Sequence, residues 1–119
     1  MRTGALTVTG AITATGEVTA YYSDVNLKKD IVEIQDPISK VMSLRGVTFR
    51  PNETALALGI TDKEEVGVIA QEVQEVLPEV VLENSEGKKS VAYGNVIGLL
   101  IEAIKEQQQT IEELKARLS

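Results

Sequence analysis

The chain has 119 residues, enough for one compact domain and an elongated extension, since single domains commonly have about 100 to 150 residues. Its net charge of −6 argues against a nucleic-acid partner, which would require clustered Lys and Arg, and the lack of Cys and His excludes disulfides, zinc-type sites and His-based catalysis. We therefore expect no metal, no cofactor and no nucleic acid.

The apolar residues indicate what kind of core the protein has and whether it crosses a membrane. They make up 43% of the chain but aromatics only 3%, so the core must consist of Val, Ile, Leu and Ala. A chain this small gains much from association, and we expect an oligomer. The longest apolar run, residues 96–101, is far shorter than the roughly 20 residues that cross a bilayer, so we expect no membrane partner and no export.

Residues 3–20 form an internal repeat of three hexads, TGALTV, TGAITA and TGEVTA. Most Thr residues occupy odd positions, and an apolar set occupies even ones, which is the period of a strand. This set is Leu6, Val8, Ile12, Ala14, Val18 and Ala20. One strand of this length would reach roughly 60 Å, so the glycines must mark bends or close backbone approaches. We interpret residues 1–23 as the end of a β-fibre stalk that wraps with copies of itself; the alternative is a flexible Thr/Gly linker.

Residues 24–94 predict a small α+β domain. We expect a helix that begins at Asp36-Pro37, continues through Leu44 and stops at Gly46, and a second helix over residues 70–77 that ends before Pro78. Residues 53–65 are interpreted as a polar connection. The turn at residues 84–88 predicts a hairpin. Strands are predicted at residues 29–34, 47–50, 66–69, 80–82 and 90–93.

The last segment, residues 95–119, predicts a long coiled-coil helix with apolar heptad positions. Position a holds Ile97, Ile104, Ile111 and Leu118, and position d holds Leu100, Gln107 and Leu114. Gln107 is a polar layer that can fix the register. Ile at a and Leu at d favour two strands over three. The alternative is an amphipathic helix packed on its own domain, and Ile101 widens the apolar stripe in its first turns.

The stretch YYSDVNLKKDI, residues 21–31, joins the repeat to the mixed sequence and contains Ser23 and Lys28. Without Cys and His, a serine with a lysine base is the familiar nucleophilic pairing that remains. The two side chains point apart in a regular strand or helix, so a turn at Val25-Asn26 or a neighbouring chain must bring them together. From these residues alone, the stretch is an ordinary charged loop.

Several ordered motifs, however, resemble the C-terminal intramolecular chaperone domain of bacteriophage endosialidases, tail spikes and tail fibres, a family of self-cleaving serine peptidases. The resemblance covers roughly residues 22–119. The motifs are Ser23-Asp24, Leu27-Lys28, Asp30-Ile31, GVIAQEV at 67–73, VLPEVV at 76–81, Tyr93 and LIEAIK at 100–105.

This resemblance implies an intertwined homotrimer that registers the upstream fibre or spike part of the same polypeptide and then releases itself. It makes Ser23 the nucleophile, Lys28 its general base and Ser23-Asp24 the severed bond. Asn26 departs from the Arg or Lys that many relatives carry there, whereas the dyad is intact. The protein would fold in the host bacterial cytoplasm as part of a virion tail fibre or spike precursor.

The cleavage chemistry leaves alternatives open. Attack by the Ser23 hydroxyl on its own carbonyl would form a four-membered ring, whereas attack on the Tyr22 carbonyl gives an N-to-O acyl shift. Attack across chains, or by water that Lys28 activates, would cut after Ser23. Two other functions compete with self-release: a trimerisation or tip domain that stays on the fibre uncut, and a dimeric coiled-coil adaptor.

Overall fold

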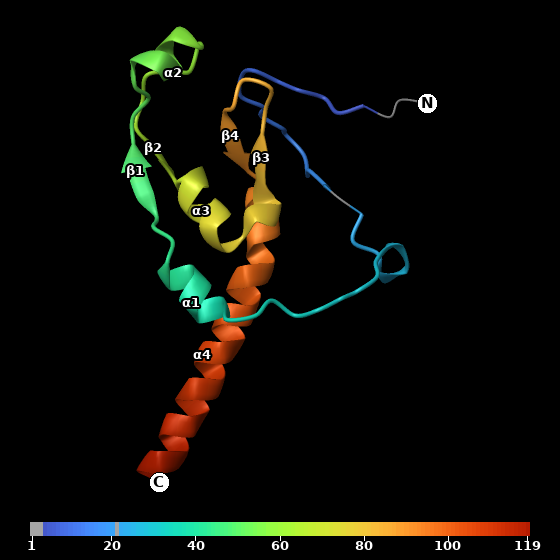
Figure 1. The fold of residues 1–119 in the computed structure, drawn as a ribbon, viewed down its shortest axis with the longest axis vertical. Coiled ribbons are helices and arrows are strands. Elements are labelled where there is room, and N and C mark those ends of the chain that lie inside the picture. Colours follow the sequence, from blue (N-terminus) through green and yellow to red (C-terminus); the bar gives the residue numbers. More distant parts are fainter. Residues whose placement is uncertain (1–3, 21) are drawn as a thin grey trace. The chain divides into compact units, whose positions relative to one another are not determined.

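The computed structural model describes residues 4–20 and 22–119 (Figure 1). Residues 1–3 and 21, which include the start of the first hexad, lie outside the described residues. The chain divides into two compact units, one of residues 1–31 with 50–64 and the other of residues 32–49 with 65–119. The predicted boundaries after residues 23 and 94 stay predictions.

In the first unit, the hexads form no strand over the described residues 4–20. Gly4, Gly10 and Gly16 all lie in bends, as the sequence predicted, and the apolar side chains are exposed. The predicted strand is therefore absent from the single chain. The physical reason is that a strand needs a hydrogen-bonded neighbour and a covered apolar face, and one copy of this segment supplies neither.

The second element of this unit is the short helix α2, Glu53–Ala57, which the sequence analysis missed. Its N-cap is Asn52, whose side-chain oxygen accepts from the Ala55 N–H at 3.0 Å. Gly59, with φ of 92°, follows the helix and takes the left-handed conformation that favours glycine. Arg50 and Asp62 flank the helix and form an ion pair at 2.9 Å. The predicted polar connection thus contains a capped helix.

The predicted strand at residues 29–34 is wrong. The structure has no strand in this stretch, and Asp30 adopts a left-handed φ of 55°, which interrupts an extended chain. The β-branched residues Ile31 and Val32 suggested a strand, but both side chains remain exposed. No neighbouring strand within the described residues pairs with them.

The core of the second unit is aliphatic, as its composition required. Helix α3, Ala70–Val76, supplies Val73, and the following 3-10 helix η2, Pro78–Val80, supplies Val80. The buried residues that form the core cluster are Val73, Leu77, Val80 and Leu99. The predicted end of the second helix before Pro78 is confirmed, since α3 stops at Val76.

Helix α1, Pro37–Met42, begins where Asp36-Pro37 predicted but is shorter than expected. Asp36 has a left-handed φ of 51° and makes no side-chain cap bond, so Pro37 starts the helix without a capping carboxylate. The helix ends at Met42 because the Ser43 and Leu44 N–H groups bond to the Lys40 and Val41 carbonyls three residues back. The predicted extension through Leu44 is therefore wrong.

Two antiparallel two-stranded sheets complete this unit. Strand β1, Val47–Phe49, pairs with β2, Glu65–Gly67, and strand β3, Val81–Glu83, pairs with β4, Lys89–Val91. The predicted hairpin at residues 84–88 is confirmed: Asn84 accepts from the Glu86 and Lys88 N–H groups, both at 2.9 Å. The predicted strands are each shifted or shortened by a residue or two.

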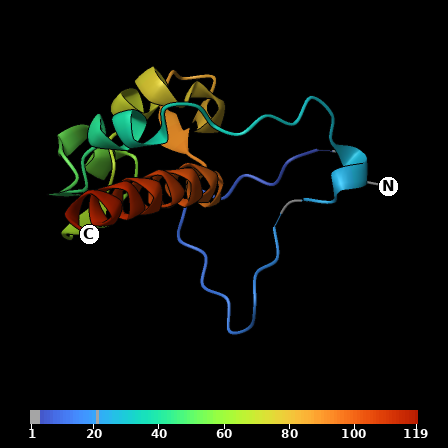
Figure 2. The same cartoon turned by 90° about the horizontal axis from the view of Figure 1, so that it is seen from below.

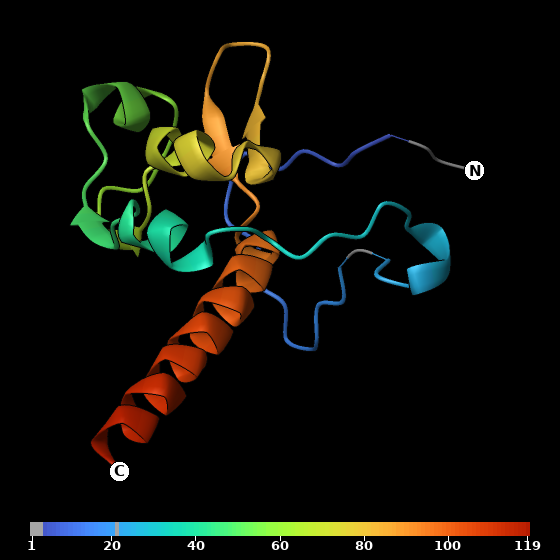
Figure 3. The same cartoon turned by 60° about the horizontal axis from the view of Figure 1, so that its bottom comes forward.

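The chain ends with the 3-10 helix η3, Tyr93–Val96, followed by helix α4, Ile97–Leu118. The predicted long C-terminal helix is confirmed. Figure 2 shows α1 and α3 on one side of α4, and Figure 3 shows α4 continuing beyond α1 toward the C-terminus. None of the helices in the described part of the chain is long and apolar enough to cross a membrane.

Candidate functional site

The junction around Ser23 is shaped by a short capped turn, the 3-10 helix η1, Val25–Leu27. Asp24 is its N-cap, and its carboxylate accepts from the Asn26 N–H at 2.9 Å. The Lys28 N–H closes the turn on the Val25 carbonyl at 3.1 Å. The predicted turn at Val25-Asn26 is thus present, but as a 3-10 turn held by Asp24 and not through a left-handed Asn26.

Ser23 and Lys28 flank this turn, one residue before its cap and one after its end. Both are exposed, and no hydrogen bond joins their side chains within the described stretch 22–31. A lysine acts as a base when burial or a neighbouring cation disfavours its ammonium form. Lys28 is exposed in the single chain. A working dyad would therefore require that the Lys28 side chain be buried by something other than this one copy.

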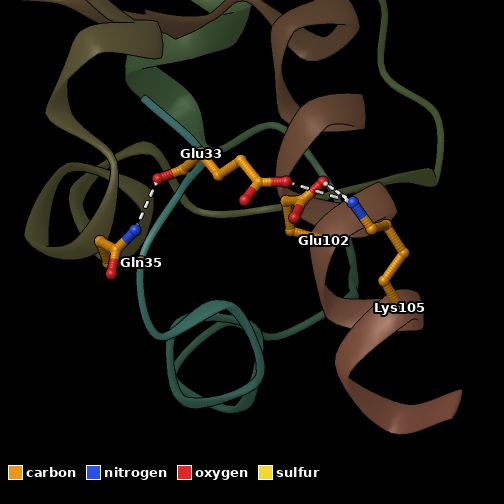
Figure 4. Close-up of polar contacts among 4 residues, drawn as sticks. All are labelled: Glu33, Gln35, Glu102 and Lys105. Atoms are coloured by element: carbon orange, nitrogen blue, oxygen red, sulfur yellow. Dashed lines mark hydrogen bonds and ion pairs between the residues drawn. The ribbon is translucent and has the colours of Figure 1, made fainter. Parts of the chain in front are cut away.

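Downstream of this turn, residues 33–38, which we call the strap, run across α4 (Figure 4). The Lys105 ammonium binds Glu33 at 3.3 Å and Glu102 at 3.2 Å. Glu106 accepts from the Ile38 N–H at 3.4 Å. The strap is therefore fixed to α4 by contacts from both of its ends.

Packing supports the polar contacts of the strap. Pro37 is buried, and Ile34 is half-buried against the core. The Ile34 side chain lies 3.6 Å from the position of a Cβ built on Gly98. The hydrogen bonds that the Lys105 ammonium donates to Glu102 and, second, to Glu33 raise the pKa of Lys105. The α4 residues that hold the strap occupy heptad positions b, c and f, away from positions a and d.

A second ion pair stabilises the region next to α1. Arg45 binds Glu72 of α3 through two nitrogen atoms, with both Nε contacts at 3.2 Å. The hydrogen bond from Arg45 lowers the pKa of Glu72. This pair connects the loop after α1 to α3. No cluster of acidic residues able to hold a metal occurs in the part of the chain that the structure describes.

The heptad residues of α4 form an exposed row that we call the a/d row. Their exposed fractions range from 45% at Leu100 to 88% at Leu118 among the apolar members, and Gln107 is exposed too. Instead, α4 buries Leu99 and Ala103, at heptad positions c and g, against its own unit. The a/d row consists of Ile97, Leu100, Ile104, Gln107, Ile111, Leu114 and Leu118.

The structure confirms that the first turns of this helix pack on their own domain, while coiled-coil pairing stays a prediction. Its first turns do pack on their own domain, but through Leu99 and Ala103 and not through Ile101, which is 51% exposed. The a/d row stays exposed, although Ile97 and Leu100 line a groove with residues of α1. A helix that leaves an apolar stripe in water is typical of an unpartnered coiled-coil seam.

Sequence reasoning missed Glu33, Lys105 and Glu106, because the partners that form the strap contacts are about 70 residues apart and leave no local pattern. Tyr93, one of the motif residues, has a structural contact: its hydroxyl accepts from the Val68 N–H at 3.3 Å. The sequence analysis assigned Asp24 only to the severed bond and missed that it caps η1. An Asp two residues before a free N–H, here that of Asn26, is the signal that could have shown this role.

Comparison with known protein families shows to which family the chain belongs. The model of a peptidase family described as chaperone of endosialidase matches residues 23–82, so the match begins at Ser23. The chain belongs to this family.

Its relatives among characterised proteins carry one name. Long tail fiber protein Gp37 of Enterobacteria phage K3 is 35% identical over 100 residues, covering 81% of the chain and 8% of that protein. Proteins of the same name are 35% identical in Enterobacteria phage T2 and 34% in Salmonella phage S16, each over 81% of the chain. The chain spans 7% of the T2 protein and 13% of the S16 protein, a small fraction of each relative.

Proposed function

We propose that this chain is the chaperone part of a phage tail fibre or spike polypeptide, which trimerises through the a/d row and then releases itself by one cut at Ser23-Asp24. The observation that carries the proposal is the exposed a/d row on a helix whose other side is already packed. The family membership and the tail fibre name of the relatives support the fibre role.

Trimerisation explains how the hexads acquire a partner. Three strands of this repeat have nothing in their sequence to fix their register, and a one-residue slip turns every apolar side chain outward. When three α4 helices associate, the upstream chains are held together and their pairing becomes effectively intramolecular. The partners are therefore two more copies of the chain and the fibre part of each polypeptide. The folding would take place in the host cytoplasm.

The cut itself consumes one water. The bond between the Ser23 carbonyl carbon and the Asp24 nitrogen breaks, water supplies the hydroxyl of the new Ser23 carboxyl group, and Asp24 becomes a new amine. Neutral Lys28 accepts the proton of the attacking group and returns it to the leaving nitrogen. The attacking group is either water or the Ser23 hydroxyl of a neighbouring copy, whose ester water then hydrolyses.

Cover from neighbouring copies couples this chemistry to assembly. Lys28 is exposed in the single chain, and burial by adjoining copies would favour its neutral form. Cleavage would then follow correct assembly, and each chain would cut once. After release, the fibre would persist because its unfolding is slow and not because the chaperone holds it.

Intact mass spectrometry tests the cut. The wild-type chain, fused to its upstream fibre part, is expected to give a fragment of residues 24–119, whereas Lys28→Ala remains whole. Ser23→Ala remains whole if the Ser23 hydroxyl attacks and is cut if water attacks directly. Ser85→Ala and Lys88→Ala, exposed positions in the β3–β4 turn, serve as matched controls and should cut normally. Co-expression of Ser23→Ala with Lys28→Ala restores cutting only if the dyad forms between chains.

The second candidate function is a trimerisation or tip domain that stays on the fibre uncut. It is favoured because no hydrogen bond joins the side chains of Ser23 and Lys28, which are both exposed. An uncut wild-type trimer would support it over self-release. A dimeric adaptor is favoured by Ile at a and Leu at d, and sedimentation that gives a dimer would support that function over both others.

A further inference from the structure

Beside the a/d row lies an apolar groove with a volume of about 360 Å³. It opens between α1, η3 and the first turn of α4. Arg45 is the charged residue in its lining, and Glu72 binds that guanidinium. The apolar lining residues outside the a/d row are Val41, Leu44, Val68, Tyr93 and Val96.

The groove continues directly into the a/d row, because Ile97 and Leu100 also line it. One wall is fixed by a close approach: the Tyr93 hydroxyl lies 2.7 Å from the position of a Cβ on Gly67 and accepts from the Val68 N–H. The groove is therefore a preformed extension of the row that we expect to be covered on assembly.

Heptad geometry identifies what can reach this groove. Ile97 is at position a, which puts Val96 at position g and Ile101 at position e. In a parallel coiled coil, e and g residues flank the a/d layers and meet between chains. A g residue lies beside the e residue of the following heptad in the neighbouring helix, five residues further on. Val96 in the groove therefore faces Ile101 of the adjacent copy.

We propose that the groove receives the Ile101 side chain of a neighbouring copy, which makes it a docking site within the assembly. This inference rests on the proposed function, because it needs parallel helices joined through the a/d row. It explains why Ile101 is apolar and 51% exposed although it belongs neither to that row nor to the core.

The other e positions show why the docking site would also select a register. They are Gln108 and Lys115, so a shift of one heptad in one direction would place the Gln108 amide in an apolar groove. A shift in the other direction would bring Gly94, which has no side chain to fill it. Only in-register helices bury Ile101. An antiparallel pair would leave the groove empty, since e and g then no longer meet.

In a trimer, each groove would be filled by the next chain around the axis, so the three contacts close into a ring. The a/d row alone favours dimers, as its Ile and Leu pattern indicates. Docking of Ile101 adds an apolar contact for each chain at the N-terminal end of α4. The groove would therefore fix parallel alignment at that end.

Cysteine cross-linking tests the contact cleanly, because the chain has no cysteine of its own. Val96→Cys with Ile101→Cys in one chain is expected to give covalent oligomers on mild oxidation. The two positions cannot bond within one chain, since they point about 140° apart around the helix. The matched control is Val96→Cys with Gln108→Cys. Gln108 lies on the same helix face as Ile101 but one heptad further along, so this pair should not cross-link.

A second variant measures the contact without cysteines. Ile101→Ala should raise the concentration at which half of the chains are assembled by about tenfold, because each chain loses buried apolar area. Leu82→Ala, which changes an exposed apolar residue on β3, should leave this concentration unchanged. Sedimentation equilibrium gives both values.

The outcomes separate this inference from the function on which it rests. A wild-type chain that sediments as a monomer at all concentrations would overturn the a/d association and the docking site together. A parallel oligomer in which residues 96 and 101 do not cross-link, or in which the pair 96 and 108 does, would overturn the docking site alone.

Discussion

The hexads and helix α4 are both periodic segments with an apolar face, yet only α4 is formed in the single chain. The difference lies in where each structure finds its hydrogen bonds. A helix bonds within its own segment, whereas a strand bonds to a neighbour. α4 is therefore ready to associate before the hexads have any structure. For the proposed assembly, we therefore expect helix association first and stalk formation afterwards.

The largest expected effect comes from removing the association face. Ile104→Asp with Ile111→Asp should abolish the oligomer, because it would bury carboxylates in two a-position layers. The hexads should then fail to form strands in the longer polypeptide. Sedimentation and far-UV circular dichroism measure the two effects.

Gln109→Asp with Ala116→Asp is the matched control for this pair, since both residues are exposed at position f of the same helix. It introduces the same charges outside the row, with at least as large a loss of helix propensity, because Gln and Ala are better helix formers than Ile. An oligomer that survives Ile104→Asp with Ile111→Asp would end the argument that the helix precedes the stalk.

An intermediate effect should follow from damage to the unit that supports α4. In Gly67→Ala the new methyl group would lie 2.7 Å from the Tyr93 hydroxyl, so the tyrosine must move. We expect a loss of about 1 to 3 kcal/mol in the free energy of unfolding, as for other overpacked sites. Urea denaturation measures the change.

Gly46→Ala is the control for that substitution, because a Cβ there meets nothing within 4 Å. In a Tyr93→Phe background, Gly67→Ala should cost less, since the hydroxyl that it meets is gone. Equal losses for Gly67→Ala in both backgrounds would show that the close approach does not limit this position.

The smallest effect concerns the ion pair between Arg45 and Glu72. Because the hydrogen bond from Arg45 lowers the pKa of Glu72, its stabilising contribution is present above the ordinary carboxyl range and is lost as the pH falls through the lowered value. Glu72→Gln should therefore lower the melting temperature slightly at neutral pH. Exposed ion pairs contribute little, so the shift will be modest.

Melting temperatures measured at decreasing pH distinguish the ion pair of Glu72 from a packing effect of its side chain. The difference in melting temperature between the wild type and Glu72→Gln should shrink as the pH falls below the range where carboxylates ionise. A difference that stays constant down to strong acid would mean that Glu72 acts through packing and not through its charge.

Local signals in the sequence predicted the elements that local chemistry determines. Asn84 and Gly87 indicated the β3–β4 turn, Pro78 indicated the end of α3, and the heptads indicated α4. The same kind of signal was present but unused at α2, where Asn52 caps the helix and Gly59 ends it. The error at residues 29–34 came from β-branched residues that have no strand to pair with.

The candidate site was less accessible to sequence reasoning. Ser23 and Lys28 are an ordinary pair of polar residues until the motifs around them are compared with a family. The strap contacts join residues that are far apart in the chain, such as Glu33 and Lys105, and depend on how α4 packs. Such contacts follow from tertiary packing and not from local pattern.

The two opposite sides of α4 have a mechanical consequence. The strap holds the outer side through Glu102, Lys105 and Glu106, while the a/d row would hold the inner side. A helix gripped on both sides cannot rotate about its axis without breaking contacts on one of them. In the proposed trimer, a twist of α4 would therefore strain the contacts that Glu33 and Ile38 make with this helix.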